Sequence, residues 1–348
     1  MPPPSGEPAN LTYIGNVMTR IHATTRAALL LAVIVTAASC SDANDPSAPT
    51  EGLPPDALAP SPAITYTGIP FGPYALYANT TDFEWGPAPF TTSLDNAGYP
   101  NAIVNRITAA RQQRHRLILA MTADRAYYIT NGKFDLAKWK SRMNTLNTTT
   151  IKKAVADGVA DGTIVANKLI DEPEIPQWGG VLTKPMIDQM ATYAKSIFPT
   201  LPMGITHGAG GFKWRSTERY KVLDWVGVQY SHNYNNGNAA GWRDEVLTFA
   251  RANGVAPAFS LNILNGGVRD QTGSWDCPNT GGKGTISTYC RMTADQVRSY
   301  GTAAGPYGCV MLMWKYDDAF MAKSANVTAF KDVASLLNSK PRPSCKRP

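Results

Sequence analysis

The strongest chemical signal in the sequence is a pair of adjacent carboxylates, Asp171 and Glu172, followed by Pro173. The pair stands at the end of the apolar run 163–171 (TIVANKLID), which has the composition of a buried strand. Two neighbouring negative charges raise the pKa of at least one of them, which suits a general acid. The alternative is structural, with Asp171 capping the next segment and Glu172 pairing with an arginine.

Other polar and aromatic side chains follow the remaining apolar runs. Carboxylates and amides can satisfy sugar hydroxyls, and aromatic rings can stack on pyranose faces, so these side chains predict a carbohydrate site. The alternative is that many of the aromatic residues are core or rim. The predicted substrate contacts are Tyr230, Trp314, Asp317, His207, Gln229, Trp85, Asn262 and Arg125.

These side chains need a scaffold that brings strand ends together. Apolar runs alternate with segments of helical period, such as 183–198 and 241–253, which indicates a parallel sheet with helical crossovers. The runs are 72–78, 116–122, 163–171, 201–207, 224–230, 257–263 and 308–314. A doubly wound sheet and a closed barrel both fit this pattern.

The sequence contains no GxGxxG motif opening a helix, which counts against a dinucleotide-binding fold. We therefore favour the α/β class and a single-domain (β/α)8 TIM barrel, whose active site lies at the C-terminal ends of its strands. The eighth strand is expected near 64–70 or within 123–162.

The Glu-Pro pair at a strand end resembles the acid/base motif of a large retaining clan of (β/α)8 glycoside hydrolases, which contains cellulases and β-galactosidases. In that clan Asn usually precedes the Glu, whereas this sequence has Asp171. The clan also carries a second Glu at the end of the seventh strand. Here the run 257–263 ends with Asn262 and Ile263, so no nucleophile is visible.

The adjacent Asp-Glu pair is similar to that of hexosaminidases that use the acetamido group of their own substrate. The run 308–314, which ends at Trp314, is similar to the last strand of family 18 chitinases, and Gln229-Tyr230 is similar to their sixth-strand motif. The DxxDxDxE signature of that family is not met, because Lys168 and Ile170 occupy acidic positions.

These resemblances imply hydrolysis of O-glycosidic bonds in a polysaccharide or glycan. Glu172 would be the general acid, and Asp171 its electrostatic or acetamide-orienting partner. Tyr230 and Trp314 would shape the central subsite, and Asp317 is a further candidate for a base or a hydroxyl ligand. The alternative function is a non-catalytic glycan-binding surface lipoprotein, built on a barrel whose catalytic set has decayed.

A metal-dependent or serine hydrolase fits less well. The four histidines are scattered, and no GxSxG motif occurs. We expect neither a metal nor another cofactor.

The N-terminal 39 residues have the pattern of a secretory signal peptide. Arg20 and Arg26 precede the apolar run 27–39, which is too short to span a bilayer. The sequence Ala37-Ala38-Ser39-Cys40 resembles a bacterial lipobox, which implies lipidation of Cys40. Plain cleavage near Ser39 is the alternative.

A Pro-rich linker over 40–63 would tether a domain at 64–348. The predicted location is that of an exported, membrane-anchored lipoprotein, held at the outer membrane, in the periplasm or at the cell surface.

Export also bears on the other four cysteines, which we expect to form two disulfides. Of three possible pairings we favour Cys277 with Cys290, and Cys309 with Cys345.

The net charge of +7 comes from scattered basic residues and becomes +6 without Arg20, Arg26 and Glu7, so a nucleic-acid partner is not indicated. The mean hydropathy of −0.22 excludes a polytopic membrane protein. We expect a monomer.

Overall fold

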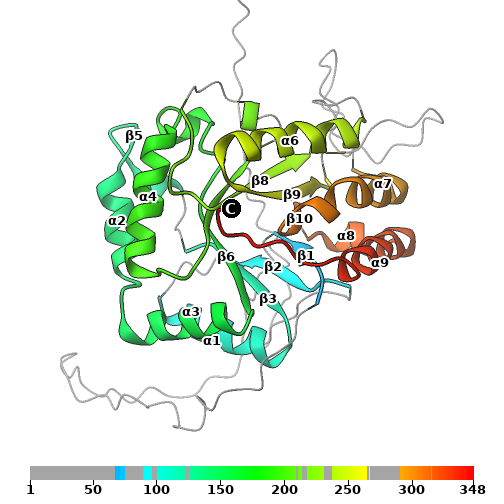
Figure 1. Ribbon diagram of the computed structural model, residues 1–348, viewed down its shortest axis with the longest axis horizontal. Helices are drawn as coiled ribbons and strands as arrows, with labels where there is room; N and C mark the ends of the chain where they lie inside the picture. Colours follow the sequence, from blue (N-terminus) through cyan, green and yellow to red (C-terminus); the bar gives the residue numbers. More distant parts are fainter. Residues whose placement is uncertain are drawn as a thin grey trace, which may run out of the picture. The chain divides into compact units, whose positions relative to one another are not determined.

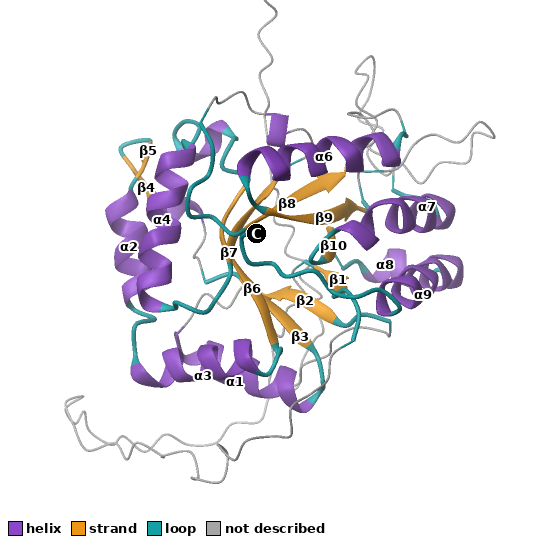
Figure 2. Ribbon diagram, in the orientation of Figure 1, coloured by secondary structure: helices purple, strands orange, loops and turns teal. Residues whose placement is uncertain are grey.

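Eight parallel strands form a barrel surrounded by helices in the computed structural model of the chain (Figures 1 and 2). The strands are β1 (Phe71–Pro73), β2 (Thr92–Asp95), β3 (Arg116–Leu119), β6 (Ile164–Asp171), β7 (Met203–His207), β8 (Trp225–Tyr230), β9 (Ala256–Asn262) and β10 (Met311–Trp314). Their order is β1-β10-β9-β8-β7-β6-β3-β2. A parallel bridge between Tyr74 and Leu94 joins the two end strands, so the sheet returns on itself. The predicted TIM-barrel architecture is confirmed.

The structure describes residues 67–74, 89–95, 100–121, 125–208, 211–213, 218–230, 237–264, 266, 291–314 and 316–348. The predicted signal peptide, Cys40, the linker, Trp85 and the Cys277–Cys290 pair lie outside these residues and stay predictions. In the described part, no helix is long and apolar enough to cross a membrane.

The eighth strand is β2, and it lies in neither of the two predicted places. Its four residues include Thr92, Ser93 and Asp95, so it lacks the apolar run by which the other strands were recognised. The stretch 123–162 instead contains the 3-10 helix η2 (Arg125–Tyr128), an antiparallel ribbon and two helices. The ribbon consists of β4 (Ile129–Thr130) and β5 (Lys133–Phe134).

The α-helices of the described part of the chain include both segments for which the 3.6-residue period predicts a helix, 183–198 and 241–253. The helices are α1 (Pro100–Gln112), α2 (Leu136–Asn144), α3 (Thr149–Ala160), α4 (Lys184–Ile197), α6 (Ala239–Asn253), α7 (Ala294–Ala304), α8 (Asp318–Met321) and α9 (Ser324–Asn338). Thr293 and Gln296 make a reciprocal capping box at the start of α7. Gly254 ends α6 with a φ of 60°, a left-handed conformation that favours glycine. Short 3-10 helices complete the crossovers: η3 (Pro176–Trp178), η4 (Gly211–Lys213) and η5 (Gly305–Tyr307).

Side-chain alternation along the strands divides the core into two parts. One hydrophobic cluster packs strands against helices, and it includes Val228 and Tyr230 of β8. A smaller cluster, with Ile118, Ala258 and Leu312, fills the interior of the barrel. Successive residues of a strand face opposite sides of the sheet. The position of a polar residue within its strand therefore determines whether its side chain reaches the barrel interior.

The C-terminal segment covers the end of the barrel where the strands begin. Cys345 forms a disulfide with Cys309, just before β10, and their Cα atoms are 5.2 Å apart. This is the second of the two pairings favoured from the sequence. The Arg347 side chain donates hydrogen bonds to the carbonyl oxygens of Leu223, Tyr220 and Asn253. Figure 1 shows the C-terminus lying over the centre of the ring of strands. We call this end the tail end and the opposite end, where the strands finish, the barrel mouth.

Candidate active site

Asp171 is the last residue of β6, and its side chain faces the interior at the barrel mouth. It is paired in register with Thr206 of β7, whose hydroxyl donates a short hydrogen bond to Asp171 Oδ1. The Nζ atom of Lys168 lies 3.4 Å from the same oxygen, and the lysine is buried within β6. A cation and a hydroxyl therefore both contact the Asp171 carboxylate.

Glu172 follows in an unusual backbone conformation, with a φ of +44°. This region is sparsely populated for residues other than glycine, so the surroundings must hold it in place. The amide of Glu172 donates to the Thr206 carbonyl at 2.7 Å, which extends the β6–β7 ladder. From the other side, the indole N–H of Trp178 lies 2.9 Å from the Asp171 carbonyl oxygen and 3.0 Å from that of Glu172.

The side chain of Glu172 occupies space that Gly208 leaves open. A Cβ atom at Gly208 would lie only 2.6 Å from Glu172 Oε1. Gly208 comes two residues after Thr206, so its missing side chain would point to the same side as the Thr206 hydroxyl. The left-handed turn at Glu172 thus brings its carboxyl to the interior side, next to Asp171, although regular alternation would send it outward.

This environment changes the acidity of Glu172. Burial, together with the negative charges of Asp171 and Glu174, raises the pKa of Glu172 from 4.5 to about 7, and the positive charges of Lys168 and Arg125 oppose the rise. A carboxyl with this pKa holds its proton through much of the neutral range and can deliver it. In the acid pair, Asp171 and Glu172, the second carboxyl therefore keeps its proton to a higher pH than an ordinary glutamate does.

Two aromatic rings lie beside the acid pair. Tyr74, directly after β1, packs edge-on against Trp314 of β10 with ring centroids 5.6 Å apart. The Lys168 ammonium lies 5.5 Å from the centroid of the Tyr74 ring. Burial and the Asp171 charge both raise the pKa of Tyr74, so its hydroxyl stays protonated and can donate a hydrogen bond.

Amides form the next part of the interior wall. The Asn262 amide of β9 donates to Gln229 Oε1 of β8 at 3.3 Å, and Asn262 is paired in register with Trp314. Ser260 of β9 is buried on the same side of the strand as Asn262. In the described part of β9, the interior-facing residues near the mouth are thus neutral, in agreement with the sequence.

Tyr230 is a correction to the sequence analysis, because its position does not fit contact with a substrate. Gln229 faces the interior, so the next residue must face outward. The Tyr230 ring is fully buried between the sheet and helices α6 and α7, with centroids 5.0 Å from Trp242 and 4.6 Å from Tyr300.

The His207 side chain also faces outward, and it contacts Glu174 at the barrel mouth. Its ring packs against Phe249 of α6, and its Nδ1 atom lies 2.7 Å from Glu174 Oε2. This position does not fit the predicted direct contact with a substrate.

Two other predicted contacts have partly structural roles. Asp317 caps α8 by accepting a hydrogen bond from the amide of Phe320 at 2.8 Å. Arg125 is exposed, and its guanidinium lies 5.7 Å from the centroid of the Trp178 ring. Its charge nevertheless reaches Glu172, because it lowers the pKa of that carboxyl.

Sequence reasoning missed Tyr74, Lys168, Thr206 and Glu174 as parts of the site. One signal was available for Lys168, which is a lysine inside an otherwise apolar strand and three residues before Asp171. Glu174 completes three carboxylates within four residues. Tyr74 and Thr206 carry no comparable signal, because only the barrel closure and the register bring them to Asp171.

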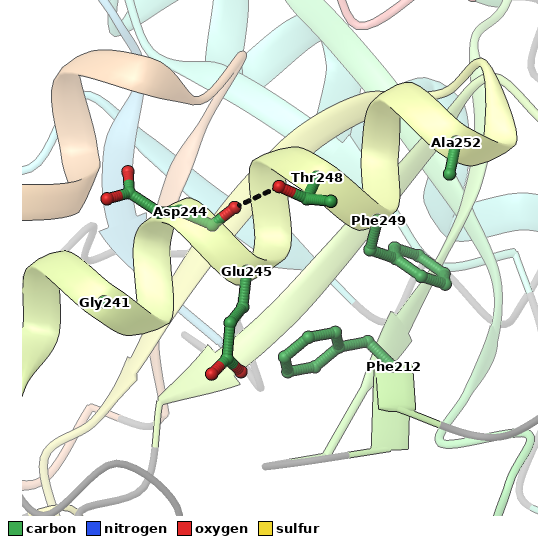
Figure 3. Close-up of a pocket in the computed structure, with 7 residues that line it drawn as sticks. All are labelled: Phe212, Gly241, Asp244, Glu245, Thr248, Phe249 and Ala252. Carbon is green, nitrogen blue, oxygen red and sulfur yellow. Dashed lines mark hydrogen bonds between the residues drawn. The ribbon is translucent and has the colours of Figure 1, made fainter.

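A groove lies along the exposed side of α6 (Figure 3). Phe212 and Phe249 supply its apolar part, and Asp244 and Glu245 lie along α6 beside them. In the portion that the structure describes, no group of His, Cys, Asp and Glu side chains has the arrangement of a metal site.

The comparisons with known proteins give the following. No family model matches the sequence, and no curated protein matches it. Among solved structures, the chain is similar to the GH113 β-mannanase AaManA from Alicyclobacillus acidocaldarius, with 12% identity and a TM-score of 0.43 over 80% of this chain and 99% of that chain. A chitinase from Rhizomucor miehei matches with 10% identity and a TM-score of 0.45, over 76% and 99% of the two chains.

The β-glucuronidase of Ruminococcus gnavus matches with 11% identity and a TM-score of 0.43 over 72% of this chain. The match covers only 43% of the glucuronidase.

Proposed function

We propose that the chain is a glycoside hydrolase in which Glu172 is the general acid and Asp171 its ionised partner. The observation that carries this proposal is the partly buried Glu172 carboxyl beside Asp171, with a pKa of about 7, at the mouth of the barrel. Protonation of a departing sugar oxygen requires a carboxylic acid that keeps its proton near neutral pH. The position of Asp171 beside it provides the negative charge that such a reaction needs at the sugar.

The reaction can be written with these two groups. Glu172 gives its proton to the glycosidic oxygen as the bond between that oxygen and the anomeric carbon breaks. Asp171, held by Lys168 and the Thr206 hydroxyl, stabilises the positive charge that develops on the sugar ring. Water supplies the hydroxyl at the anomeric carbon, and its proton returns to the Glu172 carboxylate.

The interior wall supports a sugar ligand. Trp314 is partly exposed beside Tyr74 and offers an aromatic surface to a sugar ring. The Gln229 and Asn262 amides have donors and acceptors for hydroxyls.

The absence of a carboxylate on the described part of β9 bears on the mechanism. We favour substrate assistance over direct displacement by a second glutamate, with Asp171 in the role of orienting an acetamido group. Inversion with Asp317 as the base fits less well, since that side chain caps α8. We therefore favour a substrate that carries an N-acetylated sugar.

Replacement of Glu172 by Gln tests the catalytic proposal directly. We expect turnover of the best substrate, found in a panel of aryl glycosides and polysaccharides, to fall by about 10²–10⁴-fold, because an amide cannot donate the proton. Glu245→Gln on exposed α6 is the matched control and should leave turnover unchanged. Full activity in Glu172→Gln would remove Glu172 from the mechanism.

The second candidate function is glycan binding without hydrolysis, which the neutral wall of β9 favours. In that case wild-type protein binds an oligosaccharide and releases no product. Trp314→Ala would then abolish binding, and Glu172→Gln would leave the dissociation constant unchanged. Calorimetric titration with chitin and mannan oligosaccharides, together with product analysis, separates the two functions.

We also propose export through residues 1–39 and anchoring through a lipid on Cys40. In a bacterial host, wild-type protein should incorporate labelled palmitate and sediment with membranes. Cys40→Ser should do neither. Labelling of Cys40→Ser would contradict the proposed anchor.

A further inference from the structure

We propose that Glu174 is a positioning residue for Glu172, fastened to the end of β7 by His207 and Gly208, so that the place of one carboxyl fixes the place of the other. The inference rests on the proposed function and deepens it. It concerns the contacts that hold the Glu172 carboxyl in position.

The first step is the attachment of Glu174 itself. Its Oε1 atom accepts a hydrogen bond from the Gly208 amide at 2.8 Å, and its Oε2 atom lies 2.7 Å from His207 Nδ1. Both oxygens are therefore bound to consecutive residues of one strand end. The Glu174 side chain is only 12% exposed, and that of His207 1%, so water competes poorly for these bonds.

The second step connects this attachment to Glu172. Gly208 binds Glu174 through its amide, and a Cβ atom at Gly208 would lie 2.6 Å from Glu172 Oε1. A Cβ atom at Gly211 would overlap Glu174, since it would lie 1.7 Å from Oε1. The two glycines thus leave room for two carboxyls on the same short segment.

The third step is the backbone between the two acids. Glu172 holds a left-handed φ, and its carbonyl accepts from the amide of Ile175 at 3.1 Å. This turn includes Pro173 and Glu174. The hydrogen bonds of the Glu174 side chain therefore attach the far end of the turn to β7. The Glu174 attachment adds to the hydrogen bonds by which Trp178, the Thr206 carbonyl and the Ile175 amide hold the backbone of Glu172.

The charges around both acids define the pH response. Asp171 and Lys168 on β6, Arg125 on η2 and Tyr74 after β1 interact with Glu172. His207 on β7 and Tyr220 before β8 interact with Glu174. The charge of Glu174 can be removed by a substitution that changes neither residue of the acid pair. Its charge raises the pKa of Glu172, so its removal lowers it.

The test uses two variants of Glu174. Glu174→Gln keeps the side-chain length and an acceptor for the Gly208 amide but has no charge. The basic limb of the activity profile, where Glu172 loses its proton, should move to lower pH by on the order of one unit. Glu174→Asp keeps the charge but is one methylene too short to reach both partners. It should lower kcat about 10-fold with little change in KM, and the limb should stay in place.

A direct titration makes the outcome independent of turnover. The carboxyl carbon of Glu172 is followed by NMR in wild type, Glu174→Gln and the control Glu245→Gln. A lower Glu172 pKa in Glu174→Gln alone supports the inference. Equal pKa values in all three proteins overturn it. If wild type hydrolyses no glycoside, the proposed function fails, and this titration still decides the role of Glu174.

His207 gives a further check that does not depend on the folding of a Glu174 variant. His207→Asn keeps a side-chain N–H near the position of Nδ1 and should retain most of the wild-type kcat, whereas His207→Ala should lose about 10-fold. Equal activity of both variants would contradict an attachment through this residue.

Discussion

The two ends of the barrel differ in how far their charged groups are compensated by opposite charges and hydrogen bonds. At the tail end, Asp224 accepts hydrogen bonds from Lys195 Nζ, the Met203 amide and the Arg347 amide. At the mouth, three carboxylates, Asp171, Glu172 and Glu174, share a buried lysine and a more distant arginine. The Asp224 cluster pairs opposite charges, whereas the mouth leaves a protonated acid among negative neighbours.

The difference separates stability from chemistry. A hydrogen-bonded charge cluster stabilises the position of the tail, and none of its groups has to gain or lose a proton. A carboxyl with a pKa far above its usual value costs folding free energy whenever it is ionised, and this cost is tolerated where the group works. We therefore expect substitutions at the tail end to change stability alone, and substitutions at the mouth to change both stability and turnover.

The largest expected effect comes from the disulfide at the tail end. Replacing both Cys309 and Cys345 with Ala opens a loop with a sequence separation of 36, which should cost about 4 kcal/mol of unfolding free energy. Urea denaturation of the purified protein measures this loss. Activity well below the new midpoint should be unchanged, and a fall in kcat there would mean that the two ends are coupled.

Glu172→Gln should change stability in the opposite direction, and only at higher pH. The pKa of Glu172 is about 7 in the folded protein against 4.5 in an unfolded chain. Between these values the folded state holds a proton that the unfolded state has released, so stability falls as pH rises from 4.5 to 7. The neutral amide avoids this cost, which amounts to roughly 3 kcal/mol above pH 7.

Denaturation at pH 8 and at pH 4 measures the effect. The variant should be more stable than wild type at pH 8 and about equal to it at pH 4. The same difference at both pH values would show that packing, and not ionisation, is responsible.

Arg347→Ala should have a smaller effect, confined to stability. It removes three hydrogen bonds to backbone carbonyls, so we expect a loss of about 2 kcal/mol. The exposed neighbour Lys346 provides the control, since Lys346→Ala should change stability by less than about 0.5 kcal/mol. Thermal unfolding of both variants, with activity measured alongside, shows whether the tail end acts on the mouth.

The sequence predicts much of this fold and less of the site. Seven strands are visible because both faces of each are buried, which leaves continuous apolar runs. The eighth, β2, is four residues long and partly polar, and its place in the barrel depends on neighbours far along the chain. The acid pair is visible because two carboxylates end an apolar strand.

The rest of the site depends on side-chain direction. The adjacent residues Gln229 and Tyr230 are equally plausible as ligand contacts in the sequence, but the strand alternation turns only Gln229 inward. Glu172 violates the same alternation because of its positive φ, so a strict period of two would have placed it wrongly. Tyr74 and Thr206 become site residues only when register brings them beside Asp171.

Two tryptophans that donate hydrogen bonds to the backbone at β6, Trp178 of η3 and Trp139 of α2, give the smallest and sharpest comparison. Trp178 donates its indole N–H to the carbonyls of Asp171 and Glu172, and Trp139 donates to the carbonyl of Leu169 at 3.3 Å, two residues earlier in β6. Replacing either with Phe removes a buried donor and should cost about 1 kcal/mol. Only Trp178→Phe releases the backbone that holds the left-handed turn at Glu172.

Trp178→Phe should therefore lower kcat about 10-fold, whereas Trp139→Phe should leave it unchanged at equal loss of stability. Chemical denaturation and steady-state kinetics on both variants provide the comparison. Parallel losses of kcat would mean that strand β6 responds as a whole, and that the turn at Glu172 has no separate role in placing the acid. A loss in Trp178→Phe alone would assign the strained backbone to catalysis, because both variants remove the same kind of bond from the same strand.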